Sequence, residues 1–218
     1  MNDHMVTTRG PRHMPSRIFA ELDGKKQERI LEAALKEFAE YGYENSSTNR
    51  IVKNCGISKG SLFKYFESKE ELYFYLIDTV SARMAEETRA DISGLSKDLF
   101  ERVIEYSATE ISWYAANPVK GRFLIMVASE TGSDIGRKIT ERYGAVSADI
   151  YETLLKGVDM SGLHHSRKKV TDILRWVLTG FNSSFLKDIA GSDDDIETMK
   201  KRYIKKLKGH LEVLKNGL

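Results

Sequence analysis

Apolar residues from Lys25 onward recur at the three- and four-residue intervals of amphipathic helices. A first helix is expected to begin near Lys25, and Gly42 would end it, because glycine readily adopts the left-handed conformation of a helix carboxyl cap. The apolar stripe of this helix consists of Ile30, Leu31, Ala34, Leu35, Phe38 and Tyr41.

Three further helices are predicted directly after Gly42. The hydroxyl residues at 46–48 offer caps for a short helix that reaches about Cys55, and Gly56 follows it as the turn residue. Ser58 is placed to cap another short helix, from Lys59 to about Tyr65. A capping box at 68–71 then opens a longer helix that extends to about residue 87.

The remainder of the chain favours five more helices and shows no alternation typical of strands. The sequence therefore predicts an all-α fold of about nine helices, with an amino-terminal helix-turn-helix domain and a carboxy-terminal helical domain. We expect a mostly flexible arm at 1–24, a first domain at 25–72 whose last helix continues to about 87, and a second domain at 73–218. The five helices are expected at 95–116, 119–130, 133–156, 166–190 and 193–215.

Composition narrows the class of protein. Hydrophobic residues make up 41% and charged residues 30% of 218 residues, which is typical of a chain with a real core. Apolar runs are too short to cross a bilayer, and the first residues lack the apolar stretch of a secretory signal. A single cysteine, Cys55, excludes an internal disulfide, and we expect a cytoplasmic protein.

Net charge is only +2, but positive charge gathers at the two short helices. Residues 45–69 hold five basic side chains and one acidic side chain. A solvated surface patch would explain this charge equally well, so charge by itself does not indicate a nucleic-acid partner.

The segment from Ser47 to Leu72 meets the physical requirements of a helix-turn-helix. Gly56 fits the tight turn, and apolar residues at 51, 52, 55, 57, 62 and 66 can lock the two helices together. The second helix exposes lysines beside the small pair Gly60 and Ser61, which suits entry into a DNA groove. A purely structural helical corner does not require these lysines.

This segment resembles the TetR family of transcriptional regulators. The residues that carry the resemblance are the run GISKGSLFKYFESKEEL from Gly56 to Leu72, preceded by Gly42, Thr48 and Ile51. The match covers about Lys25 to Leu72, and beyond about Val80 only helix number and length agree.

The resemblance implies a set of DNA contacts at these positions. Thr48 would cap the second helix and touch a phosphate, and Lys59 is the first choice for reading bases. Tyr65 and Lys69 would bind phosphates, whereas Phe63 stands where the family usually has tyrosine and would pack instead. The full set is Ser47, Thr48, Asn49, Lys59, Gly60, Ser61, Phe63, Lys64, Tyr65 and Lys69.

The resemblance also implies a homodimer that binds double-stranded DNA at a palindromic operator, represses transcription and is released by a small-molecule effector, with neither a cofactor nor a membrane partner. The effector would occupy a cavity in the helical domain, for which the candidate residues are Trp113, Phe123, Met126 and Trp176, although a plain helical core explains these side chains too. The candidate dimer residues are Val177, Gly180, Phe181, Ser184, Val213 and Leu214.

Other functions stay open at this point. An activator of the same family and a helical protein-interaction module without DNA binding are the alternatives. An enzyme is not expected, since the chain has no glycine-rich phosphate loop, no His-Glu-x-x-His motif and no cysteine pair. Cys55 fits a small core residue better than a redox centre, and the adjacent His164 and His165 make a poor metal site by themselves.

Overall fold

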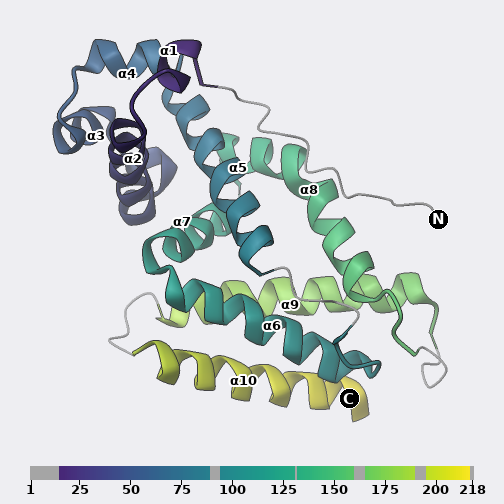
Figure 1. Ribbon diagram of the computed structural model, residues 1–218. Helices are drawn as coiled ribbons and strands as arrows, with labels where there is room; N and C mark the ends of the chain where they lie inside the picture. The colour runs from purple at the N-terminus through teal and green to yellow at the C-terminus, as the bar shows by residue number, and fades with distance from the viewer. Residues whose placement is uncertain (1–14, 89–93, 131, 160–164, 190–194, 217–218) are drawn as a thin grey trace. The chain divides into compact units, whose positions relative to one another are not determined.

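The computed structural model describes residues 15–88, 94–130, 132–159, 165–189 and 195–216. Ten α-helices and no strand occur in these ranges, so the expected all-α fold is confirmed (Figure 1). Within the same ranges, no helix combines the length and the apolarity that a bilayer crossing requires. The helices divide into two compact units.

The first unit contains the five amino-terminal helices. They are α1 (Arg17–Ala20), α2 (Gly24–Asn45), α3 (Thr48–Cys55), α4 (Lys59–Tyr65) and α5 (Lys69–Glu87). Helix α2 packs against α3 and α5, and α4 packs against α1 and α3. Gly42 has a positive φ of 67°, and one more turn of helix follows it before Ser46.

Most of α7 (Pro118–Ser129) also belongs to the first unit, although it follows α6 in the sequence. Phe123 lies at its centre and is completely buried. Its ring meets those of Phe38 in α2 and Tyr73 in α5, at centroid distances of 6.5 and 5.6 Å. The unit therefore has an aromatic core built from three helices.

The second unit consists mainly of α6 (Leu99–Ala116), α8 (Asp134–Leu154), α9 (Arg167–Ile189) and α10 (Ile196–Asn216). Helix α10 packs along α6 and also contacts α9, and α8 contacts both α6 and α9. Leu155, Phe185 and Leu207 are among the fully buried side chains of this core. The buried guanidinium of Arg102 donates to the carbonyl oxygens of Leu154 and Lys156 at 2.6 and 2.9 Å, which joins α6 to the end of α8.

Two features differ from the sequence-based expectations. The expectation of a flexible arm at 1–24 is wrong for residues 15–24, the part that the structure describes. Arg17–Ala20 is helical there, and Phe19 is buried. The single boundary expected after residue 72 also differs from the structure, because α5 and residues 119–127 of α7 join the helix-turn-helix in one unit.

Candidate nucleic-acid interface

Helices α3 and α4 form the expected helix-turn-helix. Gly56 sits between them with φ 68° and ψ 37°, a left-handed conformation that strains any other residue. The Ser58 hydroxyl caps α4 by accepting the N–H of Ser61 at 3.1 Å. Ile51 and Leu62 are buried at the contact between the two helices, together with Cys55 and Phe66.

The outer surface of this motif exposes polar and small residues. Asn49, Lys59, Gly60 and Lys64 are exposed, and Ser47, Thr48 and Ser61 are half-buried. Phe63 is 39% exposed, so it does not pack into the protein as expected. An apolar ring at this position can contact sugar or base methyl groups but cannot donate a hydrogen bond to a phosphate.

Gly60 has open space around it. A Cβ added there would meet only the Ser58 hydroxyl oxygen, at 3.9 Å, which is an ordinary van der Waals contact. Unlike Gly56, Gly60 has no positive φ, so the fold does not require glycine here. The absence of a side chain instead leaves room for an external group to approach the backbone of α4.

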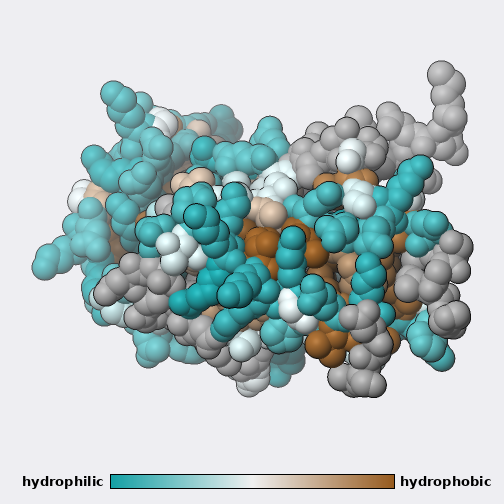
Figure 2. All heavy atoms as spheres, turned by 90° about the horizontal axis from the view of Figure 1, so that it is seen from below, coloured by the Kyte–Doolittle hydropathy of each residue, from teal (hydrophilic) through white to brown (hydrophobic). Residues whose placement is uncertain are grey.

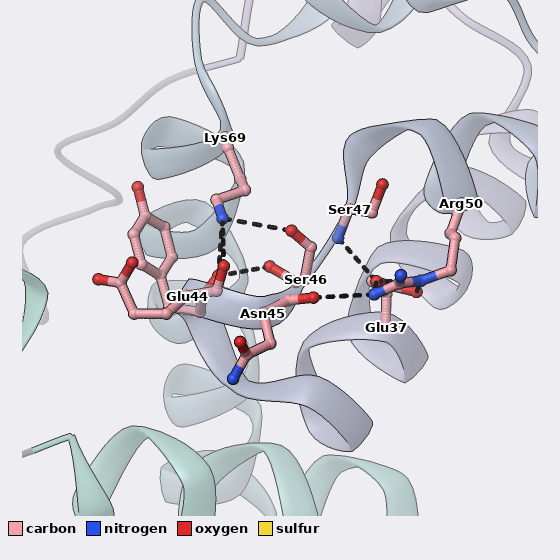
Figure 3. Close-up of polar contacts among 8 residues, drawn as sticks. Glu37, Glu44, Asn45, Ser46, Ser47, Arg50 and Lys69 are labelled. Atoms are coloured by element: carbon pink, nitrogen blue, oxygen red, sulfur yellow. Dashed lines mark hydrogen bonds and ion pairs between the residues drawn. The ribbon is translucent and has the colours of Figure 1, made fainter.

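The start of α3 is anchored by a residue that the sequence pattern did not reveal. Glu37 of α2 is only 4% exposed, and its carboxylate accepts the N–H of Ser47 at 2.7 Å and the Nε of Arg50 at 2.8 Å (Figure 3). Arg50 also donates to the carbonyl oxygen of Asn45 at 2.9 Å. The prediction that Thr48 caps this helix is wrong: Ser47 is the cap residue, it makes no side-chain capping bond, and Glu37 accepts its N–H instead.

Lys69 occupies a different position from the one expected of a phosphate ligand. Its Nζ donates to the carbonyl oxygens of Tyr43, Ser46 and Glu44 at 2.7, 3.3 and 3.4 Å (Figure 3). The ammonium also lies 4.4 Å from the centre of the Tyr43 ring. In this structure Lys69 therefore ties the start of α5 to the end of α2.

Tyr65 packs its ring within the first unit, while the phosphate contact expected of its hydroxyl stays a prediction. It is only 6% exposed, and its ring lies 5.8 Å from that of Phe19 in α1. The backbone N–H of Ser16 donates to the Tyr65 carbonyl oxygen at 2.9 Å. Helix α1 therefore braces the carboxyl end of α4.

The four residues expected around an effector cavity divide between the two units. Phe123 belongs to the aromatic core of the first unit, and Trp176 on α9, in the second unit, is 67% exposed. Trp113 is buried in α6, and Met126 is half-buried in α7. The pattern of large side chains could not distinguish these environments.

The candidate dimer residues fall into two groups. The prediction that Phe181 lies at the surface of a dimer interface is wrong, because this side chain is buried against Phe185 and Tyr203. Gly180, Ser184 and Val213 are exposed, and a shallow groove lined partly by Val177, Val213 and Leu214 runs between α9 and α10. Figure 2, viewed from the side of α10, shows hydrophobic side chains exposed between hydrophilic ones.

The remaining candidates are Cys55 and the adjacent pair His164 and His165. Cys55 is buried, and burial raises the pKa of its thiol. His164 lies outside the described residues, and His165 is exposed. Among the side chains that the structure describes, no group of three histidine, cysteine, aspartate or glutamate residues could hold a metal ion.

Comparison with known proteins relates the helix-turn-helix to one family. Residues 30–76 match the family model for bacterial regulatory proteins of the tetR family. A protein named HTH-type transcriptional repressor AcnR, from Corynebacterium diphtheriae, is 42% identical over 73 residues, which are 34% of this chain and 38% of that protein. HTH-type transcriptional repressor Rv1474c from Mycobacterium tuberculosis is 33% identical over 75 residues, or 34% of this chain and 40% of that protein. The matches thus span less than half the length of these relatives.

Solved structures extend the likeness to the fold of nearly the whole chain. A TetR family transcriptional regulator from Chloroflexus aurantiacus superposes with a TM-score of 0.65 at 20% identity, covering 94% of this chain and 98% of that one. FadR from Bacillus subtilis, solved in complex with stearoyl-CoA, gives a TM-score of 0.62 at 17% identity, covering 83% and 96%. At these identities the likeness concerns the fold alone.

Proposed function

We propose that this chain, whose residues 30–76 form a TetR-family helix-turn-helix domain, regulates transcription in the cytoplasm as a homodimer that binds a palindromic DNA operator and is released by a small-molecule effector. The observation that carries the proposal is the surface of α4, where Lys59 and Lys64 are exposed on either side of a glycine that the fold does not need.

Each exposed group of this surface has a role in the proposal. Lys59, at the first position of α4, donates to base edges in the major groove, and Gly60 lets the DNA backbone come close. Ser47, Thr48 and Asn49 at the start of α3 contact phosphates, since hydroxyls and N–H groups at a helix amino terminus suit anions. Ser61 and Lys64 add contacts from α4, and Phe63 contributes an apolar contact rather than a hydrogen bond.

Dimerisation follows from the small size of the motif. One helix of seven residues reads too few base pairs for a specific site, whereas two copies related by a twofold axis read both halves of a palindrome about 34–36 Å apart. The exposed residues of α9 and α10, with Trp176 foremost, supply an apolar face for the second copy.

The effector acts, in this proposal, by binding the second unit more tightly in a conformation that does not fit the operator. The names of the AcnR and Rv1474c repressors favour repression over activation.

Selection of bound sequences from random duplexes tests the proposal, followed by a mobility shift on the selected site at several salt concentrations. We expect a palindrome, an affinity that falls steeply with salt, and a loss of base discrimination of about 1–3 kcal/mol at one position of each half-site in Lys59→Ala. Full discrimination by Lys59→Ala would reject the assignment of this lysine. A chain that binds no duplex even at low salt would instead be a helical protein-interaction module.

A further inference from the structure

The protein itself holds two of the five cations that the sequence gathers between residues 45 and 69. Lys69 donates to backbone carbonyl groups, and Arg50 pairs with a carboxylate of α2. The three lysines of α3 and α4 are exposed instead. This difference matters for DNA binding, because only a cation that reaches a phosphate releases counterions from the duplex.

Arg50, the third residue of α3, is bound on several sides. Its Nε lies 2.8 and 3.1 Å from the two carboxylate oxygens of Glu37, and its Nη2 donates to the carbonyl oxygen of Asn45 at 2.9 Å (Figure 3). The ring of Tyr41 covers one face of the guanidinium, with its centre 4.2 Å from the central carbon. Three neighbours thus fix the planar group, in a geometry that a lysine could not reproduce.

Glu37 depends on this cation in turn. The residue is only 4% exposed, so water hydrates its carboxylate poorly. A buried carboxylate that loses its cation is costly to the folded state, whereas a solvent-exposed ionic contact returns little. We therefore expect Arg50 to stay on Glu37 when a DNA phosphate approaches.

The same carboxylate fixes the point at which α3 begins. It accepts the N–H of Ser47, the residue before the helix, and it binds Arg50 within the first turn. Between these two attachments lie Thr48 and Asn49, which are proposed above to contact phosphates. Glu37 thus restrains both sides of this segment, although its own side chain is buried.

We propose that Glu37 is a positioning residue of the DNA interface, which holds the start of α3 in place and keeps Arg50 as its own counter-ion instead of a phosphate ligand. Its role in DNA binding rests on the function proposed above. An arginine at the start of a DNA-binding helix would ordinarily be assigned a direct phosphate contact. Here the positive charge that α3 and α4 offer to the duplex comes from their exposed lysines.

Binding to a random duplex over a series of salt concentrations distinguishes the two roles of Arg50. The slope of log affinity against log salt reports how many phosphates the chain neutralises. Glu37→Gln keeps the shape of the side chain and an oxygen for the Ser47 N–H, but it removes the charge that retains Arg50. We expect the slope to steepen by about one for each bound copy, because the freed guanidinium reaches a phosphate. An unchanged slope would overturn the proposal.

A second variant removes both members of the pair. Glu37→Gln/Arg50→Gln replaces the two charges with amides that can still bond to each other. Its slope should return to that of the unmodified chain, since neither protein offers Arg50 to a phosphate. Its affinity for the selected operator should fall, because amides hold the start of α3 less firmly than an ion pair. A slope lowered by about one would show that Arg50 contacts DNA in the unmodified chain, contrary to the proposal.

Glu28→Gln is the matched control for net charge. It removes one carboxylate from an exposed position of the same helix, α2. We expect the slope of the unmodified chain in this variant. A steepening equal to that of Glu37→Gln would mean that general charge, and not the release of Arg50, strengthens binding, and the proposal would then fail.

Single methylphosphonate linkages in the selected operator give a readout that a purely structural role would not change. Each neutral linkage weakens binding only where the protein contacts that phosphate. We expect Glu37→Gln to become sensitive at one additional phosphate in each half-site, and the double variant to lose this sensitivity. Circular dichroism confirms that the variants are folded. An identical set of sensitive phosphates in Glu37→Gln and the unmodified chain would contradict the release of Arg50.

Two outcomes distinguish a failure of this role from a failure of the proposed function. If the unmodified chain binds no duplex even at low salt, the proposed function fails, and Glu37 has no DNA interface to position. If the unmodified chain selects a palindrome but Glu37→Gln has the same salt slope, the proposed function stands and the role of Glu37 and Arg50 fails.

Discussion

The ammonium group of Lys69 donates to the backbone carbonyl of Tyr43, and this joins the start of α5 to the end of α2, on either side of the helix-turn-helix. The Lys69 Nζ lies 2.7 Å from the Tyr43 carbonyl oxygen and also caps the carbonyl oxygens of residues 44 and 46. The kink at Gly42 leaves these carbonyl groups without regular helical partners. The Ser46 hydroxyl also donates to the Tyr43 carbonyl oxygen, at 2.6 Å, so side chains of Lys69 and Ser46 together fix the point at which the chain turns from α2 into α3.

Replacing this lysine distinguishes a structural role from a phosphate contact. We expect Lys69→Ala to lower the free energy of unfolding by about 1–3 kcal/mol, because three carbonyl groups each lose one donor. The slope of DNA affinity against salt should stay unchanged. A phosphate contact predicts the reverse, namely ordinary stability and a salt slope reduced by about one. Thermal unfolding and mobility shifts over a salt series measure both quantities. Lys64→Ala removes an exposed lysine that is proposed to contact DNA, so it should leave stability unchanged and lower the salt slope.

The two glycines of the motif should respond oppositely to alanine. Gly60→Ala should leave stability unchanged or raise it by up to about 1 kcal/mol, since alanine favours the helix and the added Cβ meets no clash. Its DNA affinity should fall because the methyl group blocks the approach of the DNA backbone. Gly56→Ala should destabilise the protein by more than about 1 kcal/mol, because its φ is +68°. Unaltered DNA binding by Gly60→Ala would show that the DNA does not approach α4 closely there.

Helix α1 should contribute to DNA binding without touching the DNA. Phe19 is 1% exposed and packs against Phe66 with a ring distance of 4.9 Å, so Phe19→Ala should cost about 3–5 kcal/mol of stability. DNA affinity should fall at temperatures where the first unit begins to loosen. Ile18→Ala, at an exposed neighbouring position, should change neither property. Chemical denaturation followed by circular dichroism provides the measurement.

The sequence predicted well those features that depend on nearby residues. The bounds of α4, the turn at Gly56 and the Ser58 cap follow from side chains within a few positions, and each is found in the structure. The capping box at α5 is also present, although Glu71 accepts the N–H of Glu67 rather than that of Ser68. Periodicity indicated all the long helices because their buried faces repeat at the helical interval.

Features that depend on distant partners could not be predicted in this way. Lys69 shares its residue type with phosphate ligands, and only the position of α2 reveals that it binds carbonyl groups within the protein. The packing of the Tyr65 ring depends in the same way on α1. Helix α1 has only four residues, too few for a periodic signal. The buried ring of Phe19, which packs against residues distant in the sequence, holds this helix in place. The half-burial of Glu110 could not be predicted either, because an acidic residue on a helix is usually exposed and its environment depends on how the helices of the second unit pack.

The exposed face of α9 should control the oligomeric state. Trp176 is the most exposed large hydrophobic residue among those described, and Ile173 and Gly180 lie on the same side of the helix. Trp176→Asp should therefore convert a dimer into a monomer and reduce operator affinity at least tenfold, because one copy binds only half of the palindrome. Sedimentation velocity measures the first effect. Ile18→Asp adds the same charge to an exposed residue of α1, and it should remain dimeric.

The raised pKa of Glu110 predicts how stability depends on pH. The folded protein keeps a proton on this carboxyl up to about pH 7, whereas in the unfolded chain the proton leaves near pH 4.5. Between these values the folded state binds more protons, so stability must fall as pH rises, by at most about 3 kcal/mol in total. The loss should be complete above pH 7, where both states are ionised.

Scanning calorimetry between pH 5 and pH 8 should therefore show a falling midpoint for the second unit. Glu110→Gln cannot ionise, so its midpoint should fall less over this range and should exceed that of the unmodified chain at pH 8. The tyrosines around Glu110 titrate only at higher pH and do not contribute to the difference. Parallel curves for the two proteins would mean that Glu110 ionises at an ordinary pH and that its carboxylate is well hydrated.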